Sequence, residues 1–353
     1  MKKLLAIILC ISMIFTFATG CGQDEAADPE PQDDQTEIAE DEGQETAEPE
    51  EAEEPEEPEY KFTFDPKALS GFWKDIFGET KVEAWYRLVD AALKGEDTFE
   101  CPDQETFDWV IGQFPEKCFP VLGELIGSYG ECENGVGHIY FLTSRKEFKK
   151  KLAEFTDQVE DILNKTMKED YTDMEKALSL YRYFYENYEY DYDTYEKMYI
   201  EPQNQIRCYR LFEEGTGICQ EIATAYSFLL TQAGVNATIM MGTDHTWSYV
   251  KINGKNYHID PTFVLDDDGY LGYFMMTDEQ RDITYPDDRG YYLMASNYTQ
   301  EHEIPAFSAD DDTFSKIWDT YLVDFDHDKH TIRYFYWNDQ VEREEMDFDY
   351  EGF

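Results

Sequence analysis

Three residues within the stretch 215–263 have the types that thiol chemistry requires. Cys219 follows the helix breaker Gly215–Thr216–Gly217, so it stands at the expected start of a helix. His245 opens an expected strand, and Asp260 lies on the strand that follows it. A cysteine, a histidine and an aspartate can serve acyl transfer as nucleophile, base and orienter of the base. The stretch therefore predicts a site for thiol-dependent acyl transfer.

The helix that would carry Cys219 is indicated by a periodic apolar pattern. The free N–H groups and the dipole of its first turn would stabilise a thiolate, and the same N–H groups could hold an oxyanion. Glu221 opposes this effect, because a negative charge beside the sulfur disfavours the thiolate. The apolar residues at helical spacing, closed by Gly234, are Ile222, Ala225, Tyr226, Leu229, Leu230 and Ala233.

The next two elements are expected to form a hairpin. Asn253–Gly254 is the strongest two-residue hairpin signal, and it separates expected strands at 245–252 and 255–262. A two-residue turn places Ile252 opposite Lys255 and thereby fixes the pairing of every residue behind them. A slip of one residue would move the side chains to the other face, so the predicted register is specific.

This register brings the two polar candidates together. Side chains alternate along a strand, so His245, Trp247 and Asp260 share one face. His245 and Asp260 become diagonal neighbours within reach of a hydrogen bond. His258 falls on the same face, and we expect a supporting or surface role for it. Asp244 could replace Asp260 as orienter, but it points to the other face if the strand begins there.

These motifs resemble the transglutaminase-like superfamily, a papain-related group. The glycine-x-cysteine helix start appears as Gly217–Ile218–Cys219–Gln220, and the histidine–small–tryptophan motif appears as His245–Thr246–Trp247. The closing motif appears as Asp260–Pro261–Thr262. Met174–Asp193 is similar to the lead-in helix, and residues 272–278 are similar to a segment that follows the aspartate.

The resemblance covers roughly residues 172–278 and implies roles for the three candidates. It implies Cys219 as nucleophile, His245 as base and Asp260 as orienter. The side chain that completes the oxyanion hole in the family has no clear counterpart, and Gln205 and Tyr209 are candidates for it. Trp247 is a further candidate for the pocket. The departures from the family pattern are Glu221, Ile222 and Ser248, which stand where many members carry Gly, Tyr and Asn.

The N-terminus is typical of an exported lipoprotein. Met1–Lys2–Lys3 is basic, and Leu4–Ala18 is almost wholly apolar but shorter than the roughly 20 residues of a helical membrane span. Ala18–Thr19–Gly20–Cys21 resembles the bacterial lipobox, although Ala18 stands where leucine is usual. We expect Cys21 to carry a lipid that anchors the protein at the outer, extracytoplasmic face of the bacterial cell membrane. Ordinary secretion with a chance cysteine is the alternative.

An acidic segment separates this anchor from the body. Gly22–Glu59 carries 19 acidic residues, five prolines and no Lys or Arg, and we expect an extended linker. Of the chain's net charge of −49, this linker contributes −19 and Lys2 and Lys3 contribute +2, which leaves −32 for Tyr60–Phe353. Such a charge argues against nucleic acid as a partner and against contact with anionic lipid beyond the lipid anchor.

The cysteine pattern predicts no metal site. Without a CxxC motif, a structural zinc site of the usual spacing is not expected, and we expect neither a metal nor a cofactor. An odd number of cysteines outside the cytoplasm suggests one functional thiol with up to two disulfides, and five reduced thiols are the alternative. The cysteines of the body are Cys101, Cys118, Cys132, Cys208 and Cys219.

We expect an α+β fold in which the cysteine-bearing helix packs on an antiparallel sheet. Capping signals at Ser144 and Thr172 open two helices, and a hairpin is expected around residues 327–330, where His327 and His330 would be solvated. The expected parts are a lipoprotein signal peptide (1–20), a lipid-anchored acidic linker (21–60), a helical N-terminal portion (61–170), a transglutaminase-like catalytic core (171–280) and a β-rich C-terminal portion (281–353).

The predicted function is thiol-dependent acyl transfer or amide hydrolysis at the cell surface. A peptide or protein, such as a cell-wall peptide, would be the substrate. Release of the acyl group by water would make a peptidase or amidase, and release by an amine would make a crosslinking enzyme. A non-catalytic module that binds wall glycan or peptide on the same fold is the alternative, and a plain substrate-capture lipoprotein is the third hypothesis.

Overall fold

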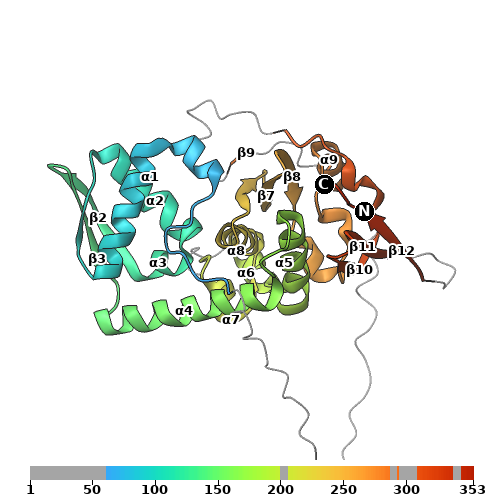
Figure 1. The fold of residues 1–353 in the computed structure, drawn as a ribbon. Helices are drawn as coiled ribbons and strands as arrows, with labels where there is room; N and C mark the ends of the chain where they lie inside the picture. The colour runs from blue at the N-terminus through green and yellow to red at the C-terminus, as the bar shows by residue number, and fades with distance from the viewer. Residues whose placement is uncertain (1–60, 199–205, 287–291, 294–307, 337–342) are drawn as a thin grey trace, which may run out of the picture. The chain divides into compact units, whose positions relative to one another are not determined.

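Helix α8 (Cys219–Gln232) lies at the centre of the fold and is buried on most of its surface (Figure 1). The computed structural model describes residues 61–198, 206–286, 292–293, 308–336 and 343–353. Within these residues, none of the helices has the length and apolar character that crossing a membrane requires. The α+β fold class is confirmed, whereas the boundaries of the five parts stay a prediction.

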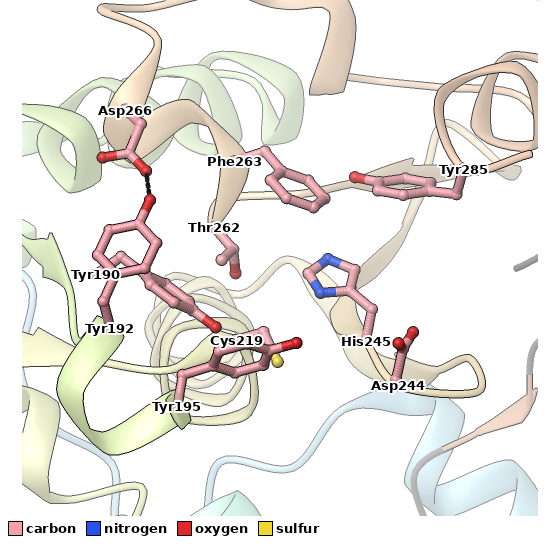
Figure 2. A pocket seen from close by; sticks show the side chains of 10 residues that line it. All are labelled: Tyr190, Tyr192, Tyr195, Cys219, Asp244, His245, Thr262, Phe263, Asp266 and Tyr285. Atoms are coloured by element: carbon pink, nitrogen blue, oxygen red, sulfur yellow. Dashed lines mark hydrogen bonds between the residues drawn. The ribbon is translucent and has the colours of Figure 1, made fainter. Parts of the chain in front are cut away.

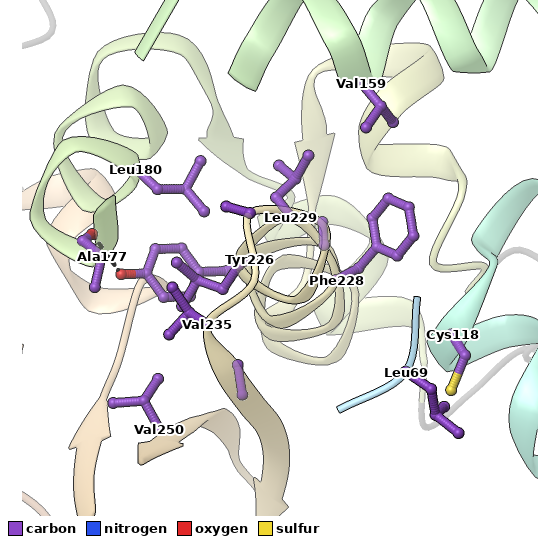
Figure 3. Packing of buried hydrophobic residues seen from close by; sticks show 14 of the residues in the cluster. Leu69, Cys118, Val159, Ala177, Leu180, Tyr226, Phe228, Leu229, Val235 and Val250 are labelled. Atoms are coloured by element: carbon purple, nitrogen blue, oxygen red, sulfur yellow. Dashed lines mark hydrogen bonds between the residues drawn. The ribbon is translucent and has the colours of Figure 1, made fainter. Parts of the chain in front are cut away.

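One side of α8 packs against an antiparallel sheet. The sheet has the order β8-β7-β6-β9, and α8 contacts its two middle strands. Val250 of the sheet and Tyr226 and Leu229 of the helix belong to one continuous core (Figure 3). The strands are β6 (Asn236–Met241), β7 (Thr246–Ile252), β8 (Lys255–Ile259) and β9 (Tyr292–Leu293).

The predicted hairpin register is confirmed. Ile252 pairs with Lys255, and Tyr249 pairs with His258. The strands are shorter than predicted, because β7 begins one residue after His245 and β8 ends at Ile259. The chain leaves β7 at that point, since the N–H of Asp260 donates to the carbonyl of Tyr273 instead. Asp260 therefore leaves the ladder while keeping its place beside His245.

Helices cover the rest of α8. The predicted capping box opens α5 (Asp173–Asn187), where Thr172 and Glu175 exchange hydrogen bonds. The Tyr226 hydroxyl of α8 donates to the carbonyl of Ala177 on α5 at 2.7 Å (Figure 3). The short α7 (Arg210–Glu214) also contacts α8, and the long α4 (Arg145–Thr166) runs along the lower edge of the view in Figure 1.

The N-terminal portion is helical, as predicted, and also contains a small sheet. Its longest helix ends at Lys94, and Gly95 closes it in the left-handed conformation. Residues 136–141 form the middle strand of an antiparallel sheet of order β1-β3-β2. The elements are α1 (Gly71–Lys94), β1 (Thr98–Glu100), α2 (Gln104–Cys118), α3 (Pro120–Leu125), β2 (Ile126–Glu133) and β3 (Val136–Phe141).

The C-terminal portion contains the expected hairpin and a third strand. His327, in the turn, is partly exposed and is also held by the protein, since its Nδ1 lies 3.0 Å from Oε1 of the buried Glu175 on α5. The sheet has the order β10-β11-β12. The elements after β8 include η1 (Phe263–Asp266), η2 (Leu271–Tyr273), α9 (Asp278–Thr284), η3 (Thr313–Lys316), β10 (Tyr321–Asp326), β11 (Thr331–Tyr336) and β12 (Glu344–Asp349).

A short parallel pair joins two segments that reach α8. Strand β4 (Glu189–Tyr190) follows α5, and strand β5 (Thr216–Gly217) leads directly into Cys219. Glu189 pairs with Thr216, and Tyr190 pairs with Gly217. Helix α6 (Tyr192–Lys197) then continues from β4. The two segments are thereby fixed against each other beside the start of α8.

The five cysteines of the body are thiols in the structure. The structure therefore agrees with the alternative of five reduced thiols and not with the expectation of disulfides. Burial raises the pKa of Cys118 and of Cys208, so both are poor nucleophiles. Cys219 borders a cavity of about 320 Å³, whereas the hollow beside Cys118 has only about 10 Å³.

Candidate active site

A cavity of about 320 Å³ opens at the N-terminal end of α8 (Figure 2). Its lining comes from five parts of the chain, which the parallel β4–β5 pair and the β7–β8 hairpin hold together. Most of the lining is aromatic, with two carboxylates and no Lys or Arg. The lining residues are Tyr190, Tyr192, Tyr195, Cys219, Asp244, His245, Thr262, Phe263, Asp266 and Tyr285.

Cys219 is the first residue of α8, as predicted. The residue before it, Ile218, is the N-cap and offers no side-chain acceptor for the first turn. The backbone N–H groups of Cys219 and Gln220 have no acceptor within the described residues, because an α-helix leaves its first N–H groups unpaired. Donors of this kind can receive an oxyanion. The thiol lies beside the imidazole of His245, and its interaction with that ring helps to raise the pKa of His245.

His245 connects the thiol to a buried carboxylate. Its Nε2 lies 2.6 Å from Oδ2 of Asp260, which leaves Nδ1 as the ring nitrogen for Cys219. The ring stacks on Phe263 with 4.7 Å between centroids, and it lies 6.0 Å from Trp247 in a second stacked arrangement. The imidazole is therefore held by its neighbours on its edge and on its faces.

Asp260 is fully buried and accepts three hydrogen bonds. Besides His245, the hydroxyl of Tyr285 donates to it, and the N–H of Thr262 donates at 2.8 Å. Burial alone would raise the pKa of Asp260, but the charge of His245 and these donors lower it below its usual range. Asp260 is thus kept ionised in the interior.

The pKa of His245 moves the opposite way. Burial lowers it, but the charge of Asp260, the hydrogen bond that His245 donates to Asp260 and the interaction with Cys219 outweigh burial and raise it to about 10. A protonated His245 beside Cys219 favours the thiolate, because the opposite charge stabilises it. The raised pKa keeps His245 protonated at neutral pH, so it can act as a proton donor beside the sulfur.

This ion pair should make the stability of the fold depend on pH at both ends of the range. Asp260 has a lowered pKa, so its contribution is present above about 3.9 and is lost as the pH falls further. His245 has a raised pKa, so its contribution is complete below about 6.5 and is lost as the pH rises toward about 10. We expect the difference in melting temperature between the wild type and His245→Gln to be largest between about pH 3.9 and about pH 6.5. A difference that stays constant up to about pH 10 in thermal unfolding would contradict the pairing.

Glu221 does not act on the thiol as predicted, because its charge is paired elsewhere. Its carboxylate accepts from Nη2 of Arg210 at 2.6 Å and from Nε of Arg210 at 2.9 Å. It also accepts from the N–H of Ile218 and from the N–H of Arg207, both at 2.9 Å. Glu221 is fully buried, so this carboxylate is a structural part of the helix start rather than a charge that faces the cavity.

The glycine before the nucleophile is explained by the same carboxylate. A Cβ on Gly217 would lie 3.2 Å from Cβ of Glu221 and 3.2 Å from Cδ1 of Leu211. These distances are tighter than ordinary van der Waals contact, so a side chain at Gly217 would push Glu221 away from Arg210. The glycine of the Gly-x-Cys motif is required here by packing.

The other predicted pocket residues are placed differently. Gln205 lies outside the described residues. Tyr209 does not line the cavity, and its ring packs against Phe155 with 5.7 Å between centroids. Trp247 is fully buried, and His258 is also fully buried, which excludes the surface role that we considered for it.

Tyr190 is a candidate for completing the oxyanion hole that the sequence did not reveal. Burial and the neighbouring Cys219 raise the pKa of its hydroxyl, which therefore stays protonated and able to donate. Figure 2 shows it with Tyr192 and Tyr195 across the cavity from His245. The only sequence signal was the density of tyrosines in residues 188–195, directly after the lead-in helix.

Comparisons with known proteins find a family over the same region. Residues 160–273 match the family model described as the transglutaminase-like superfamily. A solved structure of a TGase aligns at 13% identity over 40% of this chain and 45% of that chain, with a TM-score of 0.26. A candidate cysteine protease from Cytophaga hutchinsonii aligns at 20% identity over 25% of this chain and 30% of that chain, with a TM-score of 0.21. The chain spans less than half the length of either protein.

No curated protein matches the sequence. The family match contains Cys219, His245 and Asp260, and it begins near the end of α4. It also contains β4 and α6, which carry three of the tyrosines that line the cavity. The chain therefore carries a transglutaminase-like domain over residues 160–273.

Proposed function

We propose that this protein is a thiol-dependent acyl-transfer enzyme that acts on amide bonds of peptides or proteins. One observation carries the proposal: a single imidazole, His245, contacts both the Cys219 thiol and the buried Asp260 carboxylate at the border of an open cavity. Each group then occupies the position that its role requires, with Cys219 as nucleophile, His245 as acid and base, and Asp260 as orienter.

The first half of the reaction would leave a thioester. The Cys219 thiolate attacks the carbonyl carbon of an amide in the cavity and forms a carbon–sulfur bond. The carbonyl oxygen becomes an oxyanion, which the first-turn N–H groups of α8 and the Tyr190 hydroxyl can receive. The His245 imidazolium then gives its proton to the amide nitrogen, the carbon–nitrogen bond breaks, and the amine leaves.

The second half would return the enzyme to its starting state. His245, now neutral, takes a proton from an incoming water or amine, whose oxygen or nitrogen attacks the thioester carbon. The tetrahedral intermediate collapses and the carbon–sulfur bond breaks. Water yields a carboxylic acid, as in a peptidase or amidase, and an amine yields a new amide, as in a crosslinking enzyme. The proposal covers both acceptors, because the same three residues serve each.

We place this activity outside the cytoplasm, at the outer face of the cell membrane. The support is the apolar N-terminal stretch, the lipobox-like residues 18–21 and the acidic linker that follows them. Peptides of the cell wall or of surface proteins are the substrates within reach of such an anchor. The net charge of −32 on residues 60–353 disfavours polyanionic substrates.

The binding-module alternative stays open, with two of its three grounds weakened. It rested on Glu221 as a charge that would suppress the thiolate, on the absent oxyanion partner and on the aromatic-rich surface. Glu221 is paired with Arg210, and Tyr190 is available as the partner. A binding module would instead show saturable binding of wall peptide or glycan that survives Cys219→Ala.

The proposal predicts fast alkylation of Cys219 by iodoacetamide well below pH ~8.5, the unperturbed value for a thiol. The physical reason is that the protonated His245 keeps the sulfur ionised. The rate would be measured against pH on the purified protein, with the modified residue identified by mass spectrometry. In His245→Ala the reaction below pH ~8.5 should disappear, because the thiol then titrates without a cationic partner.

The control for this measurement is Cys219→Ala, which shows how much label the other cysteines take up. Slow labelling of the wild type with an ordinary thiol profile, unchanged in His245→Ala, would overturn the proposal. If Cys219 is labelled rapidly below pH ~8.5, the next step is to screen amide and ester substrates.

A further inference from the structure

We propose that His258 and Asp278 are positioning residues, which act on His245 through the indole of Trp247. This inference rests on the proposed function, because it assigns a second histidine–aspartate pair to the support of the first. His258 is fully buried below the cavity and lines no part of it. It is therefore not a catalytic residue in the sense of touching a substrate.

The pair forms a continuous chain of hydrogen bonds that ends at Trp247. Nε1 of Trp247 donates to Nδ1 of His258 at 2.8 Å. Nε2 of His258 lies 2.9 Å from Oδ1 of Asp278. The far end of the chain is thus a carboxylate that is 40% exposed, while the near end is a tryptophan without exposed surface.

These hydrogen bonds determine which ring nitrogen of His258 carries the proton. An indole N–H can only donate, so Nδ1 of His258 must be the acceptor and Nε2 must carry the ring proton. That proton is then donated to Asp278. Burial lowers the pKa of His258, and the neutral tautomer is the form that this arrangement needs. The two histidines of the site are therefore held in different states, since the pKa of His245 is raised.

Asp278 is itself fixed by the backbone. Its Oδ2 accepts from the N–H of Ala309 at 3.3 Å, and its own N–H donates to the carbonyl of Ala309 at 2.7 Å. His258 is tied to the same segment, since it exchanges two backbone hydrogen bonds with Met276, at 2.9 and 2.8 Å. The segment 272–278, which the family resemblance singled out without a role, is the element that holds this carboxylate in place.

The position of Trp247 matters for catalysis because its indole packs against His245, the acid and base, and against Tyr285, which donates to Asp260. Its ring is stacked with that of His245, 6.0 Å apart and 17° from parallel, and with that of Tyr285, 6.3 Å apart and 16° from parallel. The guanidinium of Arg281 lies 4.4 Å from the indole centroid. A rotation of the indole would therefore displace the imidazole that bridges Cys219 and Asp260.

Two substitutions of His258 separate the two hydrogen bonds. His258→Asn places an amide oxygen near the position of Nδ1 and can still accept from Trp247. His258→Gln places its amide near the position of Nε2 and can still contact Asp278, but Trp247 loses its acceptor. Both variants remove the ring and replace it with an amide, so they are matched in chemistry and differ in which bond survives.

The experiment is the pH profile of Cys219 alkylation by iodoacetamide, measured on the full chain. We expect His258→Gln to lower the rate constant at about pH 6 by roughly 10-fold, the lower end of what loss of a supporting partner costs in metal sites. We expect His258→Asn to stay close to the wild type. At high pH, where every thiol is ionised, the three proteins should react at similar rates. Asp278→Ala, at a partly exposed position, should shift the profile in the same direction by a smaller amount.

Thermal unfolding of each variant, with His138→Gln on β3 as a control in another sheet, separates this role from simple stabilisation. Equal profiles for the wild type and all three variants would overturn the inference while leaving the proposed function intact. Equal losses in His258→Gln and His258→Asn that follow their lost stability would also overturn it. A wild type without reaction below pH ~8.5 would instead remove the proposed function, and this inference with it.

Discussion

Asp260→Asn is expected to lower the rate of Cys219 alkylation at about pH 6 by roughly 100-fold, because an uncoupled thiol of pKa ~8.5 is less than about 1% ionised there. The carboxylate is fully buried and lies 2.6 Å from Nε2 of His245. An amide keeps the shape but removes the charge that raises the pKa of His245. Its NH₂ group can also face the ring and favour the wrong tautomer. The rate would be read from mass spectrometry of the alkylated protein over time.

Asp244→Asn is the matched control for this result. Asp244 precedes His245 and lines the cavity, and it was the alternative orienter in the sequence. The largest contributions that raise the pKa of His245 come from Asp260 and then from Cys219. Asp244→Asn should therefore leave the profile unchanged within about twofold. A large loss in Asp244→Asn with little change in Asp260→Asn would reverse the assignment of the orienter.

Glu221→Ala is expected to lower the free energy of unfolding by about 3–5 kcal/mol, the usual cost of removing one partner of a buried ion pair. Glu221 is fully buried, and the Arg210 side chain is 6% exposed. The substitution removes two hydrogen bonds of Arg210, which keeps Asp191 and Glu214 as partners, and it leaves the N–H groups of Ile218 and Arg207 without their acceptor. The quantity would be measured by urea unfolding, with the midpoint and slope compared to the wild type.

Two further variants show whether the charge pair causes that loss. Glu213→Ala removes a partly exposed carboxylate of α7 and should cost less than about 1 kcal/mol. Arg210→Met combined with Glu221→Met removes both buried charges and should be less destabilised than Glu221→Ala, because only the more exposed Asp191 and Glu214 then lose an ionic partner. If the double variant is as unstable as the sum of its single variants, the two residues are not coupled and the argument fails.

The parts of the site that the sequence predicted were those set by local chemistry. Asn253–Gly254 determines the hairpin register, and that register brings His245 near Asp260, although both residues lie just beyond the paired strands. The same is true of the helix start at Cys219, which depends on the glycines directly before it. These signals act within a few positions along the chain, so no knowledge of distant contacts was needed.

The parts that could not be predicted depend on contacts between distant segments. In the sequence, Glu221 is a negative charge close to the nucleophile, with no visible partner. Its partner Arg210 comes from α7, so the pair forms only when α7 packs on α8. The strand pattern alone does not show whether the side chain of His258 is buried. Its burial follows from Met276, which pairs with His258 at the edge of β8. Tyr285 reaches Asp260 from the end of α9, 25 positions away along the chain.

The parallel pairing of β4 with β5 has a consequence for protein engineering. It makes the tyrosine-bearing segment a separate insert, since residues 188–197 contribute three cavity side chains but none of the three reacting groups. Its backbone bonds to residues 215 and 217 would survive a change of side chains. Selectivity could therefore be redesigned by exchanging Tyr192 and Tyr195, while Tyr190 and Asp191, the partner of Arg210, are kept.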